Sequence, residues 1–177
     1  MTLVYHGSPN EFKQFSYSKI GDNGTTEGIG FYFTNNKSIA EHYAKKENNS
    51  GYLYIADFIG KKSLSITEKT ITKKQLRVFL SHLGNIYLDN WGDSVFEGQK
   101  KLLDIACENE YNNSESDVDI ICSILHGCGH YEFILSTLNR VLGYDCIVIN
   151  SPEWGESQII YVALLHSAYE IKEVIKF

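Results

Sequence analysis

The amino-acid sequence predicts an α+β fold, and three features of its hydrophobic pattern support this prediction. Short β-prone runs fill the first third of the chain, helical periodicity occupies about residues 70–142, and β-prone runs return at the C-terminal end. Because the two strand-rich ends must pair with each other, we expect sheets that pinch a cleft, with the helical segment packed alongside. A length of 177 residues suits one domain, so we expect a single domain over 1–177 with a helical insertion at about 70–142.

Breaker residues and the spacing of apolar side chains set the expected element boundaries. In the first third we expect a strand at 3–6 ending at the turn Gly7-Ser8-Pro9-Asn10, a glycine-rich surface loop at 21–30, an aromatic strand at 31–33, a short helix at 37–46 and a strand at 52–58. Four apolar helix faces lie within 76–83, 95–106, 118–125 and 134–141. The closing strands are expected at 146–149, 158–164 and 171–177.

Composition and charge exclude several classes of protein. A hydrophobic content of 43% with only two prolines is typical of a folded globular chain. The net charge of −6 repels phosphate backbones, so tight nucleic-acid binding is disfavoured. The chain has neither the run of about 18–20 apolar residues that a membrane span needs nor a basic-then-apolar signal at its start. We therefore expect a cytoplasmic protein without a membrane partner.

Cysteine and histidine spacing favours buried thiols over metal ligands. The four cysteines have no regular spacing, which fits free thiols in a reducing compartment: Cys107, Cys122, Cys128 and Cys146. Two of them fall within nine residues together with His126 and His130. A structural zinc site takes well-spaced pairs from two turns or hairpins, however, so we expect core cysteines and helix-end histidines there, and no metal.

Three short motifs occur in order in the first third of the chain. They are Tyr-His-Gly-Ser at 5–8, Gly-Phe-Tyr-Phe-Thr at 30–34 and Ala-Glu-His-Tyr at 40–43. Together they resemble the diphtheria-toxin and poly(ADP-ribose) polymerase branch of the ADP-ribosyltransferases, including the 11-residue spacing from Tyr32 to Tyr43. The resemblance implies an ADP-ribosyltransferase-like split β-sheet core around an NAD cleft, with an inserted helical segment and with NAD as co-substrate.

The same resemblance implies an NAD-binding set of six residues: His6, Gly7, Ser8, Tyr32, Phe33 and Tyr43. Two aromatic rings, from a strand and from the next helix, can close on both faces of a nicotinamide. Gly7 lets its backbone approach the carboxamide, and His6 is expected to donate a hydrogen bond to the adenosine ribose. The alternative is that Tyr32 and Tyr43 are ordinary core aromatics and that His6 is a satisfied strand histidine.

The family also carries an acid at the start of a late strand, where it stabilises the oxocarbenium character that develops as the nicotinamide–ribose bond breaks. The best match to that strand is Gln158-Ile159-Ile160-Tyr161, so a Gln stands where the family has a Glu. Glu156 lies two residues earlier and points to the same side of an extended segment. We predict Glu156 as the catalytic carboxylate, Gln158 as a ribose ligand and Glu153 as a reserve acid; alternatively, Glu156 is a solvated loop charge.

A second departure concerns the short helix. The family often has a serine three residues before its second tyrosine, which bonds the carboxamide, and this position holds Ala40. Ser38 or the Gly7 backbone would have to replace that contact.

The expected activity is transfer of ADP-ribose from NAD to a target protein, with nicotinamide released and the helical insertion recognising the target. By analogy, the chain resembles small phage or bacterial effectors that inactivate a host or immune protein. Two alternatives stay open. One is a weak or inactive NAD or ADP-ribose-binding module that acts by occupying its partner, and the other is an NAD glycohydrolase.

Overall fold

The computed structural model of the chain describes residues 1–20, 29–46, 50–88, 99–151 and 158–177. The chain divides into two compact units, Met1–Ser63 with Asp145–Phe177, and Leu64–Tyr144. The first unit contains the sheet and one α-helix, and the second contains the other described α-helices. The α+β prediction is therefore confirmed, and the helical segment that the sequence places at about 70–142 forms the second unit.

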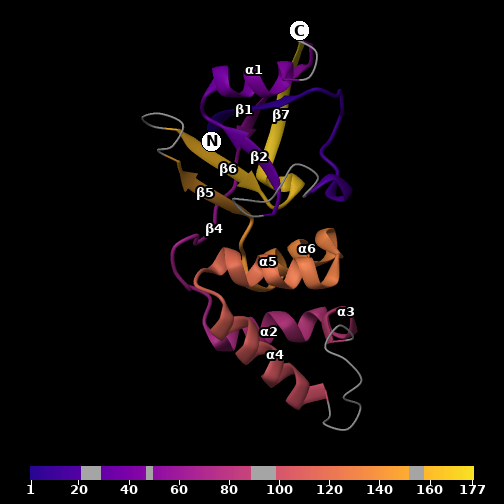
Figure 1. The fold of residues 1–177 in the computed structure, drawn as a ribbon, viewed down its shortest axis with the longest axis vertical. Coiled ribbons are helices and arrows are strands. Elements are labelled where there is room, and N and C mark those ends of the chain that lie inside the picture. The colour runs from indigo at the N-terminus through magenta and orange to yellow at the C-terminus, as the bar shows by residue number, and fades with distance from the viewer. Residues whose placement is uncertain (21–28, 47–49, 89–98, 152–157) are drawn as a thin grey trace. The chain divides into compact units, whose positions relative to one another are not determined.

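The sheet has the strand order β4-β5-β6-β2-β1-β3-β7 (Figure 1). Its strands are β1 (Thr2–Ser8), β2 (Phe31–Thr34), β3 (Tyr52–Phe58), β4 (Ser63–Leu64), β5 (Cys146–Asn150), β6 (Ile159–Ala163) and β7 (Tyr169–Lys176). β2 pairs antiparallel with β6, and β3 pairs antiparallel with β7. The expected pairing of the first and last thirds of the chain is thus confirmed.

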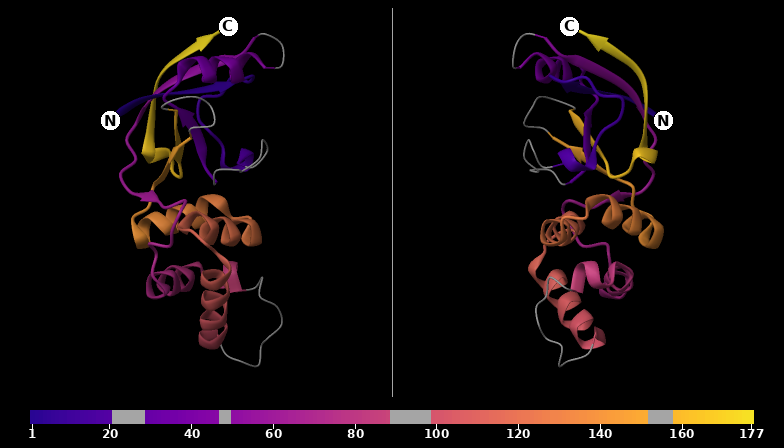
Figure 2. Two further views of the ribbon diagram at one scale, coloured as in Figure 1. Left: turned by 60° about the vertical axis from the view of Figure 1, so that its left-hand side comes forward. Right: turned by 90° about the vertical axis from the view of Figure 1, so that its right-hand side faces the viewer.

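Side chains of one parity fill the core on one face of the sheet. Val4 of β1, Phe31 and Phe33 of β2 and Ala56 of β3 are buried in one cluster. Because strand side chains alternate, residues of the other parity lie on the opposite face. That opposite face is the one covered by α1 (Lys37–Lys45), which runs along β1 and β3 (Figure 2).

Two glycines allow α1 to lie directly on the strands. A Cβ at Gly7 of β1 would stand 1.8 Å from the carbonyl oxygen of Ala40, and one at Gly51 would stand 2.0 Å from that of Ala44. Ala40 and Ala44, the buried residues of the helix, face these gaps with the smallest side chain available. Asn36 starts the helix, because its side-chain oxygen accepts a hydrogen bond from the Ile39 N–H.

The second unit is a set of amphipathic helices around a buried carboxylate. Its helices are α2 (Lys73–Leu83), α3 (Asn85–Leu88), α4 (Gln99–Asn113), α5 (Asp117–Cys128) and α6 (Tyr131–Leu142). Asp117 is fully buried and accepts hydrogen bonds from the backbone N–H groups of Ser65, Thr70 and Ile71. A charged group in the core is tolerated only with such partners, so Asp117 fixes the chain that leads into α2.

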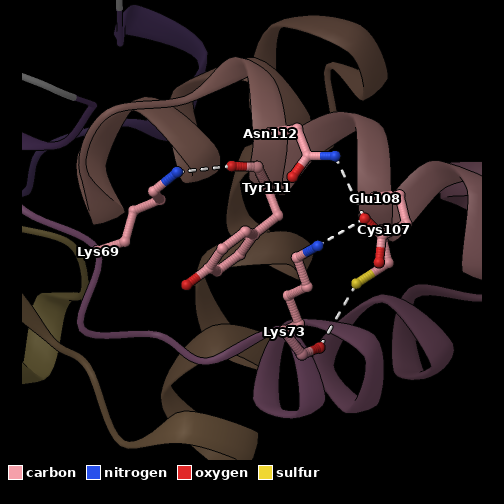
Figure 3. A network of polar contacts seen from close by, with 6 residues as sticks. All are labelled: Lys69, Lys73, Cys107, Glu108, Tyr111 and Asn112. Carbon is pink, nitrogen blue, oxygen red and sulfur yellow. Dashed lines mark hydrogen bonds and ion pairs between the residues drawn. The ribbon is translucent and has the colours of Figure 1, made fainter.

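A polar network joins α2 to α4 (Figure 3). The ammonium group of Lys73 contacts the Glu108 carboxylate at 2.5 Å, and the pKa of Glu108 is lowered by that hydrogen bond. Lys69 donates to the carbonyl oxygen of Tyr111 at 2.9 Å, and its ammonium group lies 4.6 Å from the centre of the Tyr111 ring. Arg77 pairs with Asp104 one turn further along the same two helices. These polar contacts add to the apolar side chains that α2 and α4 bury.

The four expected helix faces correspond to α2, α4, α5 and α6. Val95, expected on the second face, lies outside the described residues, as does most of the predicted loop at 21–30. The short elements β4 and α3 were not expected, because two and four residues are too few to show a hydrophobic period.

Substitution of Gly7 by alanine should destabilise the first unit. The added methyl group would meet the backbone of α1, which cannot rotate away as a side chain can, so we expect a loss of about 1–3 kcal/mol or more in the free energy of unfolding. The matched control is Gly127→Ala at an exposed position of α5, where no atom lies within 4 Å of the new Cβ. That variant should gain about 0.5–1 kcal/mol from helix propensity. Urea denaturation measures the free energy of unfolding of both variants. Equal stability of the two would contradict the packing argument.

Candidate active site

His6 lies where the sheet opens between β1 and β2. β1 pairs with β3 along its whole length, from Thr2 to Ser8. In the described residues, by contrast, its pairing with β2 is a single register position, Tyr5 opposite Thr34. Just beyond that position, Nδ1 of His6 lies 2.8 Å from the carbonyl oxygen of Tyr32. A side chain therefore continues the contact where the backbone ladder stops.

The environment of His6 fixes its protonation. A carbonyl oxygen can only accept, so Nδ1 carries the proton and donates to Tyr32. Aromatic rings of Phe12, Phe15 and Tyr54 surround the imidazole, with centroid distances of 5.8, 4.6 and 5.9 Å. Burial lowers the pKa of His6 to about 4, although the Tyr32 hydrogen bond acts in the opposite direction. The ring is neutral at pH 7, and its Nε2 presents a lone pair.

This tautomer corrects one expectation from the sequence. We predicted that His6 donates a hydrogen bond to a ribose. In the structure its one ring proton is already used on Tyr32, so Nε2 can only accept at neutral pH. A sugar hydroxyl would donate to His6 instead.

Tyr32 and Tyr43 both belong to the α1 side of the sheet. Phe31 and Phe33 point into the core, so alternation directs the side chain of Tyr32 to the opposite face, on which α1 lies. Tyr43 is on α1 itself and is 44% exposed, so its side chain is accessible to a ligand. The two phenols thus come from successive elements on one side of one sheet, as the resemblance requires.

The structure gives Phe33 and Ser8 supporting positions. Phe33 is 2% exposed, on the core face, and its ring lies 6.0 Å from the His6 ring. Ser8 is also buried, and its hydroxyl oxygen accepts a hydrogen bond from the Asn10 N–H at 3.1 Å, within the turn that ends β1. Both residues therefore lie next to His6, with Phe33 packed behind it and Ser8 holding the turn.

Gln158 precedes β6 and continues its register. Its carbonyl oxygen accepts from the Ser151 N–H at 3.0 Å, which extends the ladder between β5 and β6 by one pair. Gln158 has the parity of Val162, the residue opposite Tyr32, so its side chain lies on the Tyr32 side of the sheet. Asn35 fixes this strand start, because its side-chain oxygen accepts from the Ile159 N–H at 2.9 Å.

The amide oxygen of Gln158 gives the clearest indication of a ligand-binding position in this region. The residue is buried, and among the described residues Oε1 has no hydrogen-bond partner. A buried acceptor without a partner costs about 1–3 kcal/mol, so such atoms point to a ligand or to another group that completes them. Glu153 and Glu156, the two acids predicted for this site, lie outside the described residues.

The comparison with protein families agrees with this geometry. The model of a family described as ADP-ribosyltransferase in polyvalent proteins matches residues 1–163. The chain belongs to this ADP-ribosyltransferase family. Searches of curated proteins and of solved structures found no match.

Sequence reasoning missed three residues that shape the site of this ADP-ribosyltransferase. Phe12, Phe15 and Tyr54 enclose the His6 ring, and Phe12 stacks on Tyr54 at 4.1 Å. The segment after Pro9 shows neither helix nor strand period, and Tyr54 looks like any other strand tyrosine. The one available signal was the pair of phenylalanines three residues apart directly after the histidine motif.

Two further searches concern metals and membranes. Within the described ranges, no group of three or more His, Cys, Asp and Glu side chains could hold a metal ion. The same residues include no helix of sufficient length and apolarity for a membrane span.

The lowered pKa of His6 predicts acid sensitivity of the fold. Between pH 6.5 and about 4 the unfolded chain binds a proton that the folded chain excludes, so stability falls as the pH falls through this window. The loss is at most about 3 kcal/mol. His6→Gln removes the titration and keeps a donor for Tyr32. Its free energy of unfolding should therefore improve relative to the wild type on acidification, as urea denaturation at pH 7, 5.5 and 4 would show. Parallel pH profiles for the two proteins would refute the assignment.

Proposed function

We propose that this chain transfers ADP-ribose from NAD to a side chain of a target protein and releases nicotinamide. The observation that carries the proposal is the buried amide oxygen of Gln158, which has no partner in the described part of the chain and lies on the same face as Tyr32. It stands at the strand position where the family places the residue that contacts the nicotinamide ribose. His6, Tyr32 and Tyr43 lie on the neighbouring elements, so the polar and aromatic groups needed for NAD belong to one unit.

The residues fit NAD in complementary ways. Tyr32 and Tyr43 offer ring faces to the flat nicotinamide, which adds about 0.5–1.5 kcal/mol beyond the area buried. His6 Nε2 and Gln158 Oε1 are both acceptors, and ribose hydroxyl groups are donors. The open edge of β1 at Gly7 leaves backbone polar groups for the carboxamide, in place of the serine that Ala40 replaces.

The transfer breaks the bond between the nicotinamide nitrogen and the ribose C1′, and the nicotinamide leaves with the electron pair. The acceptor side chain forms the new bond to C1′ with its lone pair and loses its proton. Positive charge develops on the sugar during this step, and Gln158 is a neutral amide that cannot balance it. We therefore assign the negative charge to Glu156, with Glu153 as reserve. Gln158 holds the ribose hydroxyl.

The partner we propose is a protein recognised by the helical unit. The network of Lys69, Lys73, Glu108 and Tyr111 braces α2 against α4, so this unit offers a fixed helical surface. The four cysteines are free thiols, which suits action in the cytoplasm. An effector role, in which a phage or bacterial protein inactivates one host or immune protein, follows by analogy with small transferases.

Gln158 also supports a second candidate, an NAD-binding module that transfers poorly. A neutral amide still accepts a hydrogen bond from a hydroxyl group, although more weakly than a carboxylate does, and it stabilises a cation far less. If the acids at 153 and 156 do not reach the ribose, binding persists without transfer. NAD glycohydrolysis is the third outcome, in which water takes the place of the protein acceptor.

Incubation with NAD labelled in its adenylate part and with cell lysate separates these candidates. A transferase should label a protein band, and Glu156→Ala should reduce that labelling about 100-fold or more. Release of free ADP-ribose without a labelled band indicates a glycohydrolase. NAD binding without either product indicates a binding module and rejects the proposed transfer.

The tyrosine pair gives a second test. Tyr32→Ala and Tyr43→Ala should each raise the KM for NAD about tenfold, because each removes one ring face and its apolar area. The matched variants Tyr32→Phe and Tyr43→Phe keep the ring and should stay within about twofold of the wild type. Similar KM values for the Ala and Phe variants would show that these rings do not clamp the nicotinamide.

A further inference from the structure

The hydroxyl group of Tyr54 anchors the segment that follows β1. We call residues 10–15 the arm. Tyr54 is fully buried in β3, and its hydroxyl oxygen accepts a hydrogen bond from the Phe12 N–H at 2.7 Å. The carbonyl oxygens of Phe12 and Asn10, at 3.1 and 3.4 Å, are both within reach of its single proton. One side chain therefore holds the backbone of the arm by accepting from the Phe12 N–H and donating its proton to one of the two carbonyl oxygens.

The anchored arm covers the imidazole of His6. The Phe12 ring stacks on the Tyr54 ring with 8° between the planes, and Phe15 meets His6 edge-on at 4.6 Å. Phe12 and Phe15 also contact each other, at 4.6 Å. The two phenylalanines are only partly buried, so the arm is a surface segment laid over the histidine and not part of the main core.

We propose that Tyr54 is a positioning residue for NAD binding: by anchoring the arm over His6, it holds the ring neutral, with Nδ1–H on Tyr32 and the Nε2 lone pair free for a ribose hydroxyl. This inference rests on the proposed function for the role of Nε2. The anchoring of the arm depends only on the contacts of Tyr54 described above.

The chemistry explains why such a device is needed. A histidine in water has a pKa of about 6.5, so at neutral pH part of it would be protonated, and a protonated ring has no lone pair to accept with. The aromatic cover removes the hydration that stabilises the charged form. Tyr54 is the titratable side chain that contacts the His6 ring among the described residues, and Glu11 of the arm acts on Tyr54. Burial raises the pKa of Tyr54, so it stays uncharged while His6 titrates.

The test is Tyr54→Phe in the full chain, which removes one oxygen atom and keeps the ring that stacks on Phe12. NMR of the ¹⁵N-labelled histidine rings across pH 3–8 reads both the pKa and the tautomer of His6. We expect the pKa to rise by about one unit or more towards 6.5 as water reaches the ring. The dissociation constant for NAD at pH 7, measured by calorimetry, should rise about tenfold.

Two further variants make the result decisive. Tyr52→Phe removes a hydroxyl group from the same strand, from a ring whose centre lies 5.6 Å from the Lys176 ammonium group, and should leave the His6 pKa and the dissociation constant for NAD at the wild-type values. Phe15→Ala keeps Tyr54 but opens the cover, so it should raise the pKa of His6 as Tyr54→Phe does.

If the pKa of His6 is unchanged in both Tyr54→Phe and Phe15→Ala, the inference is overturned. It is also overturned if the pKa changes in Tyr54→Phe while the dissociation constant for NAD does not. Absence of any transfer product would reject the proposed function, but the His6 pKa and the dissociation constant for NAD would still test this inference.

Discussion

The hydrogen bond from His6 Nδ1 to the carbonyl oxygen of Tyr32 is the contact on which the site depends. It lies where β1 and β2 stop pairing, so it serves two purposes at once. It satisfies a backbone acceptor that the ladder no longer reaches, and it orients the histidine where β1 and β2 separate. A fully paired strand would leave no space for a ligand, whereas an unpaired one would leave buried polar groups unsatisfied. The imidazole satisfies the Tyr32 carbonyl oxygen without requiring the two strands to pair there.

The rest of the first unit keeps that opening in place from both faces. On one face, α1 lies so close to β1 that only glycine fits at Gly7, and this contact fixes the helix that carries Tyr43. On the other face, the arm held by Tyr54 closes over the histidine. Binding groups set on rigid elements lose little entropy when a ligand arrives. The elements that carry the aromatic and polar side chains of the candidate site are therefore held in place before a ligand binds.

The elements were predictable because each carries a local signal, whereas the contacts around His6 were not. Periodicity located α2, α5 and α6, and the motif order pointed to His6, Tyr32 and Tyr43. The tautomer of His6 depends on Phe12, Phe15 and Tyr54, which meet only after β1 and β3 pair. Sequence gives the identity of a titratable group, but its charge depends on burial and on neighbours brought from other elements. That is why the sequence indicated a donor role for His6, whereas its hydrogen bond to Tyr32 leaves Nε2 as an acceptor.

Gln158 shows how this family's chemistry depends on a single atom. A carboxylate at the start of β6 would be buried beside an unpaired position, and its charge would be costly unless a cation or a hydroxyl group were bound. An amide lowers that cost and still presents an acceptor oxygen. If the chain transfers ADP-ribose as proposed, the negative charge needed for catalysis must come from outside β6. Under the proposed function, the exchange of Glu for Gln separates holding the sugar from stabilising its positive charge, two tasks that one carboxylate would otherwise perform together.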